Sequence, residues 1–230
     1  MNFDLLNIIK DFCDKFELEY LKGEFKLILT DNVADYIRQK DYLYYTWLKK
    51  PFDPFGMCYV DPNEEYKLLV DTVRQNLPNI IVTTLHEYTH LGDYMRYGQT
   101  KPTVSRRNLQ EDDTFRYWSE FHASYLSHMF VFSLDDTSMD YERIGVEILQ
   151  SYQEAIKQDT CDREYAVYES VHKYGEYIAL QERYPIINSH PINFYINDAF
   201  RNIYDFLFTH RTIDKFLKDY QEYDKLINQI

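Results

Sequence analysis

The amino-acid sequence predicts an α+β fold that is mostly helical, with a small β-sheet near the front and a helical body behind it. Three short apolar runs, 25–29, 57–60 and 66–70, have the length and bounding residues of strands. From residue 79 onward, apolar residues recur at helical spacing over much longer segments. Only 6 glycines and 7 prolines occur in 230 residues, so long flexible linkers are not expected.

The first fifty residues predict a helix, a strand and a second helix. Residues 1–20 carry apolar side chains at helical spacing and predict an amphipathic helix. The run 25–29 begins just after Gly23 and suits a strand. Residues 31–49 again have a helical pattern, with Asp31 or Asn32 as the expected N-cap.

The next segment predicts a loop and a β-hairpin. Residues 50–56 contain two prolines, each of which disfavours helix at and before its position. Met57–Val60 and Tyr66–Val70 are expected to be strands, and they could pair around the turn residues 61–63.

The remainder of the chain predicts helices. A strong helical pattern covers 79–97 and is expected to end at Gly98, before a polar loop at 99–111. A second strong helix is expected from Asp112 or Asp113 to about Ser133. Four further helices are expected at about 141–158, 162–183, 191–209 and 212–229.

Charge and cysteine content exclude several classes of function. The formal charge of −13 disfavours binding to nucleic acid and to an anionic membrane surface. Three cysteines without a CxxC pair argue against a cysteine-ligated zinc site and against a disulfide framework. We see no signal peptide and no apolar run long enough to span a membrane, so we expect a soluble, cytoplasmic protein.

One motif points to metal chemistry. His86-Glu87-Tyr88-Thr89-His90 fits the pattern H-E-x-x-H. Positions i and i+4 share one face of a helix, so both imidazoles can reach one tetrahedral Zn²⁺. Glu87 is rotated by about 100° from His86, and it can therefore lie beside the metal without ligating it. There a carboxylate can take the proton of a zinc-activated water.

A catalytic zinc usually has three protein ligands, and three residues compete for the third place. Glu120 and His122 lie on the second strong helix, about 200° apart, so both cannot easily face the same ion. Asp93 follows His90 on the same rigid helix and reaches a shared tetrahedral centre poorly. The better expectation for Asp93 is that its carboxylate accepts a hydrogen bond from the N–H of a ligand imidazole.

This arrangement resembles the gluzincin branch of the zincin metallopeptidases. Glu120-Phe121-His122-Ala123 is similar to the E-x-x-A of compact gluzincins, in which the small residue permits close helix approach. The resemblance implies that His86, His90 and Glu120 bind Zn²⁺ and that Glu87 is the general base. It covers roughly residues 56–130.

The departures from related patterns narrow the resemblance. Thermolysin-like enzymes have an aspartate where this chain has Ser124. The metzincin pattern requires glycine and histidine where this chain has Asp93 and Arg96. These differences exclude the metzincin branch. For the whole chain we expect one zincin-like domain over 1–230, with a catalytic core at 1–135 and a helical extension at 136–230.

The expected function is that of a zinc-dependent metallopeptidase acting on a peptide or protein. The resemblance implies an edge strand that aligns the substrate, for which residues 66–70 are the candidate. It also implies an oxyanion-stabilising donor, for which the candidates are Tyr168, His172, Tyr174 and His190. Two alternatives stay open: a catalytically silent zinc-binding protein of the same fold, and a helical interaction module with an accidental motif.

Overall fold

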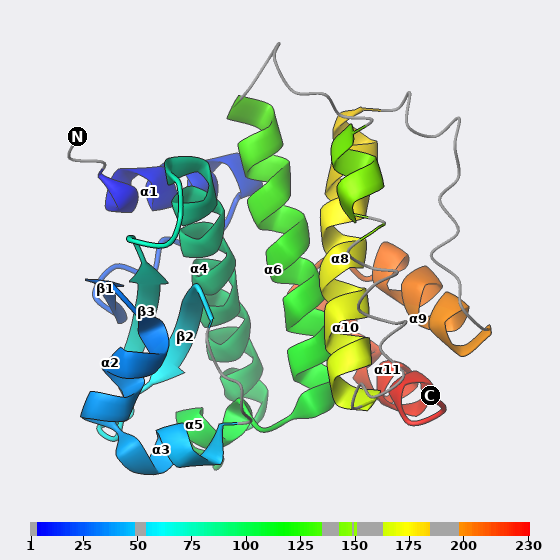
Figure 1. Ribbon diagram of the computed structural model, residues 1–230. Coiled ribbons are helices and arrows are strands. Elements are labelled where there is room, and N and C mark those ends of the chain that lie inside the picture. The colour runs from blue at the N-terminus through cyan, green and yellow to red at the C-terminus, as the bar shows by residue number, and fades with distance from the viewer. Residues whose placement is uncertain (1–3, 49–53, 135–142, 149, 151–162, 185–197) are drawn as a thin grey trace. The chain divides into compact units, whose positions relative to one another are not determined.

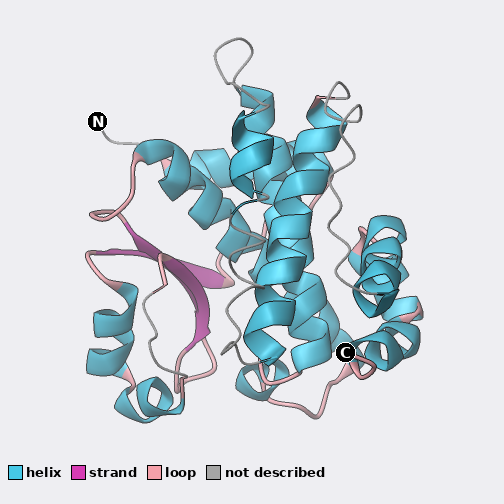
Figure 2. Cartoon of the chain, turned by 45° about the vertical axis from the view of Figure 1, so that its right-hand side comes forward, coloured by secondary structure: helices cyan, strands magenta, loops and turns pink. Residues whose placement is uncertain are grey.

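The described residues of the computed structural model form two compact units, 1–109 and 110–230. The description covers residues 4–48, 54–134, 143–148, 150, 163–184 and 198–230. Helices predominate, and the strands form one small sheet in the first unit (Figures 1 and 2). The predicted fold class is confirmed. The assignment of one domain, with a catalytic core at 1–135 and a helical extension at 136–230, stays a prediction.

The first unit surrounds a three-stranded sheet with the order β1-β3-β2. β1 (Phe25–Thr30) runs parallel to β3 (Tyr66–Asp71), and β2 (Gly56–Val60) runs antiparallel to β3. The predicted hairpin of β2 and β3 is confirmed. Its turn is closed by Asp61, whose side chain accepts hydrogen bonds from the Asn63 and Glu65 amides at 2.9 and 3.1 Å.

The strand expected to align a substrate is not at an edge of this sheet. β3 lies between β1 and β2, and each of its residues is buried. The sequence run alone hides this, because the parallel partner β1 lies about forty positions earlier and joins the hairpin only through tertiary structure. The expectation for residues 66–70 is therefore wrong, and β2 is the strand of the hairpin that lies at an edge.

Helices cover the sheet of the first unit. α4 (Leu77–Thr100) packs against β2 and β3, and α1 (Leu5–Phe16) packs against α4. α2 (Val33–Lys40) joins the sheet through a buried apolar cluster of Val33, Ile37, Tyr59 and Leu69. The helix, strand and helix predicted at the front are thus all present, and the sheet has a rigid helical support.

The helix predicted at 31–49 is divided into two helices in the structure. α2 begins after the expected N-cap Asn32, and α3 (Tyr42–Trp47) follows after Asp41. Asp41 has a non-helical backbone (φ −150°, ψ 73°) and caps α3 by accepting a hydrogen bond from the Tyr44 amide at 3.2 Å. Its carboxylate also binds Arg107 and accepts a hydrogen bond from Tyr59. These contacts with distant residues explain the break.

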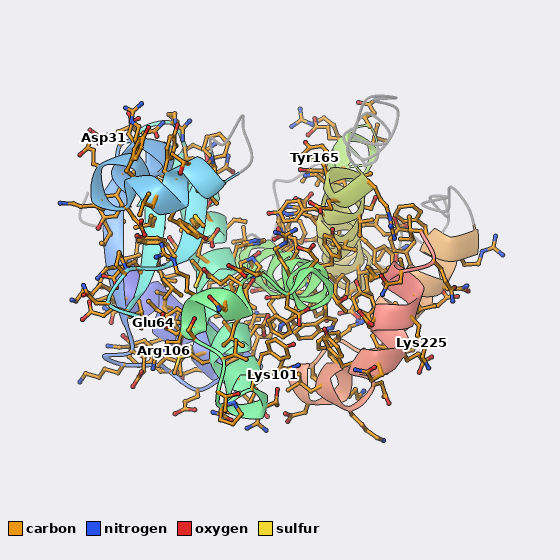
Figure 3. The ribbon with its side chains drawn as sticks, turned by 90° about the horizontal axis from the view of Figure 1, so that it is seen from below. Asp31, Glu64, Lys101, Arg106, Tyr165 and Lys225 are labelled. Carbon is orange, nitrogen blue, oxygen red and sulfur yellow. The ribbon has the colours of Figure 1, made fainter. Side chains whose placement is uncertain are left out.

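The end of α4 also differs from the prediction. The helix continues past Gly98 to Thr100, and the Lys101 amide caps it by donating to the Gly98 carbonyl at 3.0 Å. Within the predicted loop 99–111, residues Arg106–Leu109 form the short helix α5. Arg106 donates to Glu64 at the hairpin turn, and the two residues lie side by side in Figure 3.

The second unit is helical in all its described residues outside the connections. The helix expected from Asp112 or Asp113 to about Ser133 is α6 (Asp113–Leu134). The helix expected at 162–183 is α8 (Arg163–Arg183). α6 and α8 run parallel, side by side (Figure 1). A Cβ built on Gly175 of α8 would lie 2.5 Å from the Phe121 carbonyl of α6. A glycine is therefore required where the two backbones approach.

Shorter helices complete the second unit. α9 (Asp198–Thr209) matches the end of the helix expected at 191–209, whose first residues lie outside the described part. The helix expected at 212–229 is divided by Asp219 into α10 (Ile213–Lys218) and α11 (Tyr220–Ile227). Of the helix expected at 141–158, the described residues 143–148 are helical.

Candidate metal centre

The H-E-x-x-H motif lies in the middle of α4, as predicted. Asn76 caps this helix by accepting a hydrogen bond from the Asn79 amide at 3.0 Å, and Pro78 occupies its first turn. The motif follows two turns later, where the helix is buried in the first unit. Its side chains are therefore held by a well-anchored helix.

His86 and His90 point at each other. Their Nε2 atoms are 3.0 Å apart, and the rings meet edge to face at 82°. Each residue is 8% exposed. At this distance one ring can donate its N–H to the other, with the donor set by the tautomers of the two rings. Two nitrogen ligands of one tetrahedral zinc are roughly 3.3 Å apart, so a small rotation of either ring would place both on a shared ion.

Glu87 leaves the same turn of α4 in another direction and contacts the edge strand β2. Its Oε2 accepts a hydrogen bond from the Cys58 amide at 2.5 Å. Gly56 makes room for this carboxylate, because a Cβ there would lie 2.9 Å from Glu87 Oε1. The rotation of Glu87 away from the two histidines agrees with the sequence prediction. Cys58 and Gly56 were missed, since no local pattern connects them with α4.

Asp93 is a buried carboxylate, 3% exposed, one turn beyond His90. Burial raises the pKa of the Cys58 thiol well above its usual value, and the negative charges of Glu87 and Asp93 raise it further. The thiol therefore stays protonated near neutral pH. The expected hydrogen bond from a ligand imidazole to the Asp93 carboxylate stays a prediction.

The second unit buries Glu120 between α6 and α8. Glu120 is 2% exposed, and its Oε1 lies 2.6 Å from Nδ1 of His172 on α8. His122 instead stacks on Trp118, with ring centroids 4.7 Å apart. The two residues therefore have different surroundings, as their separation around the helix predicted.

His172 lies between two carboxylates. Its Nε2 is 2.9 Å from Oε1 of Glu176, which also forms an ion pair with Lys173. Burial alone would lower the pKa of His172, but the hydrogen bonds to Glu120 and Glu176 raise it to about 10. Burial likewise opposes ionisation of Glu176, yet its contacts with His172, His128 and Lys173 hold its pKa well below the usual range. The group is a partly buried network in which acidic and basic side chains contact each other.

The other candidates for an oxyanion donor are placed differently. Tyr174 is buried and stacks between Phe121 and Tyr204, with centroid distances of 5.8 and 4.4 Å. Tyr168 lies partly exposed on α8. His190 lies outside the described residues. The assignment of an oxyanion donor stays a prediction.

Residues suited to metal binding thus occur in both units. His86, Glu87 and His90 belong to the first unit, and Glu120 and His172 belong to the second. Imidazole and carboxylate groups are the ligands that zinc takes in proteins, and these side chains could take part in holding a metal ion. Imidazole also suits copper, iron and nickel, so the donor set does not by itself select zinc.

Comparison with protein-family models, with curated proteins and with solved structures finds no match for this chain. Among the helices within the described ranges, none has the length and apolar character needed to cross a membrane.

Proposed function

We propose that the protein is a zinc-dependent metallopeptidase in which His86 and His90 bind the metal and Glu87 is the general base. The observation that carries the proposal is the pair of buried Nε2 atoms 3.0 Å apart on one face of α4. Two neutral imidazoles that face each other offer at least one lone pair directed at the space between them. An ion bound there would be coordinated by both.

Glu87 is suited to proton transfer beside such an ion. When bound, zinc would acidify a water molecule and polarise the scissile carbonyl. Glu87 is 8% exposed, and the Cys58 amide holds one of its carboxylate oxygens, which fixes the direction of the other. Through Oε1 the carboxylate can accept a proton from water and return it to the leaving amine.

Glu120 is the proposed third ligand. The proposal rests on the resemblance to compact gluzincins, and it is supported by the burial of Glu120 and its bond to His172. Zinc content should fall in Glu120→Ala and should be unchanged in His122→Ala, whose side chain stacks on Trp118. Comparable losses in both variants, or in neither, would contradict the assignment.

Metal analysis and a cleavage assay test the activity. Purified protein should contain about one zinc per chain, and His86→Ala should contain much less. With a mixed peptide library read by mass spectrometry, Glu87→Gln should keep the zinc and lose cleavage by about 10²–10⁴-fold. Glu24→Gln, at an exposed position in the same unit, should behave as the wild type. Wild-type protein without stoichiometric metal would refute the proposal.

One observation favours a second candidate, a zinc-binding protein without catalytic turnover. The short hydrogen bond from the Cys58 amide to Glu87 stabilises the ionised carboxylate and makes it a weaker base. This candidate predicts one zinc per chain, no cleavage of any library peptide by the wild type, and unfolding on chelation. Cleavage that depends on Glu87 would exclude it.

A further inference from the structure

The side chains that surround Glu120 in the second unit have a role of their own. Glu120, His172 and Glu176 form a continuous chain of hydrogen bonds at 2.6 and 2.9 Å, from α6 to α8 and along α8. An ionised carboxylate can only accept hydrogen bonds. Both ring nitrogens of His172 lie at hydrogen-bond distance from these carboxylates, so the ring can donate to Glu120 on one side and to Glu176 on the other.

We infer that His172 is a positioning residue: it fixes the carboxylate of Glu120 for metal binding and is itself oriented by Glu176. This inference rests on the proposed function, because it assigns His172 a role toward the proposed ligand Glu120. It replaces the sequence expectation that His172 stabilises an oxyanion, since both of its ring nitrogens lie at hydrogen-bond distance from carboxylates.

The distance between Glu120 and His172 separates positioning from direct ligation. Two ligands of one tetrahedral zinc are roughly 3.3 Å apart. Glu120 Oε1 and His172 Nδ1 are 2.6 Å apart, which is the distance of a short charge-assisted hydrogen bond. While Nδ1 donates its proton in that bond, it has no lone pair to offer a metal.

The backbone around this chain of hydrogen bonds is rigid. Gly175, three residues after His172, lets α8 approach α6 so closely that a Cβ there would meet the Phe121 carbonyl at 2.5 Å. Lys173 donates to both carboxylate oxygens of Glu176, at 2.9 and 3.1 Å, and so restrains this side chain as well. His172 has a side chain that is 25% exposed, so its contacts with the two carboxylates provide most of its orientation.

Zinc affinity, measured by competition with a chromophoric chelator, tests the inference. His172→Ala should bind zinc about 10–100-fold more weakly than the wild type, as is usual when a partner of a metal ligand is removed. His172→Gln keeps an amide N–H that can donate to Glu120 but is a poor zinc ligand, so it should restore most of the affinity. His210→Ala removes a comparable histidine–aspartate pair elsewhere in the unit and is the control.

X-ray absorption of the zinc form provides a readout that a purely structural role would not move. Outer-shell scattering should count two imidazoles in the wild type and also two in His172→Gln. Three imidazoles in the wild type, with losses in both His172 variants as large as in His86→Ala, would make His172 a ligand and overturn the inference. Wild-type affinity in folded His172→Ala would also overturn it. A wild type that binds no zinc would refute the proposed function first.

Discussion

Replacing Gly56 by alanine should disrupt the contact between the edge strand β2 and Glu87. The added Cβ would lie 2.3 Å from Thr83 Cγ2 and 2.9 Å from Glu87 Oε1. Thr83 is β-branched and stiff within α4, so the strand and the carboxylate must shift. Overpacking costs about 1–3 kcal/mol, and loss of the Cys58–Glu87 hydrogen bond adds to it, for a total of about 2–4 kcal/mol.

Alanine also has a smaller, stabilising effect. It lowers the conformational entropy of the unfolded chain, which stabilises the folded state by only about 0.4–1 kcal/mol. The free energy of unfolding of the first unit can be followed by hydrogen exchange of the β2 and β3 amides in increasing urea, even where the two units unfold separately. Gly92→Ala is the matched control, because a Cβ on that α4 glycine meets nothing within 4 Å. It should stabilise the helix by about 0.5–1 kcal/mol.

A double-mutant cycle identifies the clash. Thr83→Ser removes Cγ2 and keeps the hydrogen bond from Oγ1 to Gln75, which is 2.8 Å long. Alone it should cost about 1 kcal/mol. Combined with Gly56→Ala it should cost at least about 1 kcal/mol less than the sum of the two single changes. Additive costs, or a stable Gly56→Ala, would refute the close packing of β2 on α4.

Three further predictions concern the fold and the metal. Burial raises the pKa of Asp41, but Arg107 and hydrogen bonds from the Tyr44 amide and the Tyr59 hydroxyl outweigh this effect, so the pKa is lowered in the folded protein. The ionised Asp41 therefore stabilises the fold above about pH 3.9, the pKa of an unfolded aspartate, and this stabilisation is lost as the pH falls through the lower pKa of the folded state. The difference in the free energy of unfolding in urea between the wild type and Asp41→Asn should therefore shrink below about pH 3.9. A difference that widens there would contradict this prediction. Tyr88→Phe leaves the Leu21 amide without its 2.9 Å acceptor and should cost about 1–3 kcal/mol, whereas Tyr165→Phe, 47% exposed, should change little. Chelation should lower the melting temperature, since zinc at 100 times its Kd contributes about 2.7 kcal/mol, and an unchanged melting curve would argue against a bound metal.

Local patterns predicted the elements of this fold because their causes are local. The pairing of His86 and His90 follows from helix geometry alone. The hairpin follows from two apolar runs around a turn that Asp61 closes through its own neighbours. His172 and Glu176 have the same i, i+4 spacing on a helix. This spacing could have identified the pair from the sequence.

Contacts between distant segments could not be predicted in this way. Asp41 breaks a helical pattern because it binds Arg107, 66 positions later. Glu87 is bound by the Cys58 amide, and Glu120 by His172, across separations of 29 and 52 residues. Each partner is an ordinary residue in its own segment. Its role appears only when tertiary structure brings it to a buried carboxylate that needs a donor.

The buried charges of the two units predict which unit a bound metal ion would stabilise more. In the second unit, Glu120 and Glu176 are balanced by His172 and Lys173. The histidine pair of α4 lies on a helix that also buries Glu87 and Asp93, so a divalent cation there would offset two negative charges as well as join two rings.

Removing the metal should therefore loosen the first unit more than the second. Hydrogen exchange with and without chelator measures this directly. Amides of α4 around His90 should lose more protection than amides of α8 around Glu176. Equal losses would contradict this prediction. A loss confined to α8 would show that the ion is held by the carboxylates of the second unit, and the pair on α4 would then be a hydrogen bond between two core histidines.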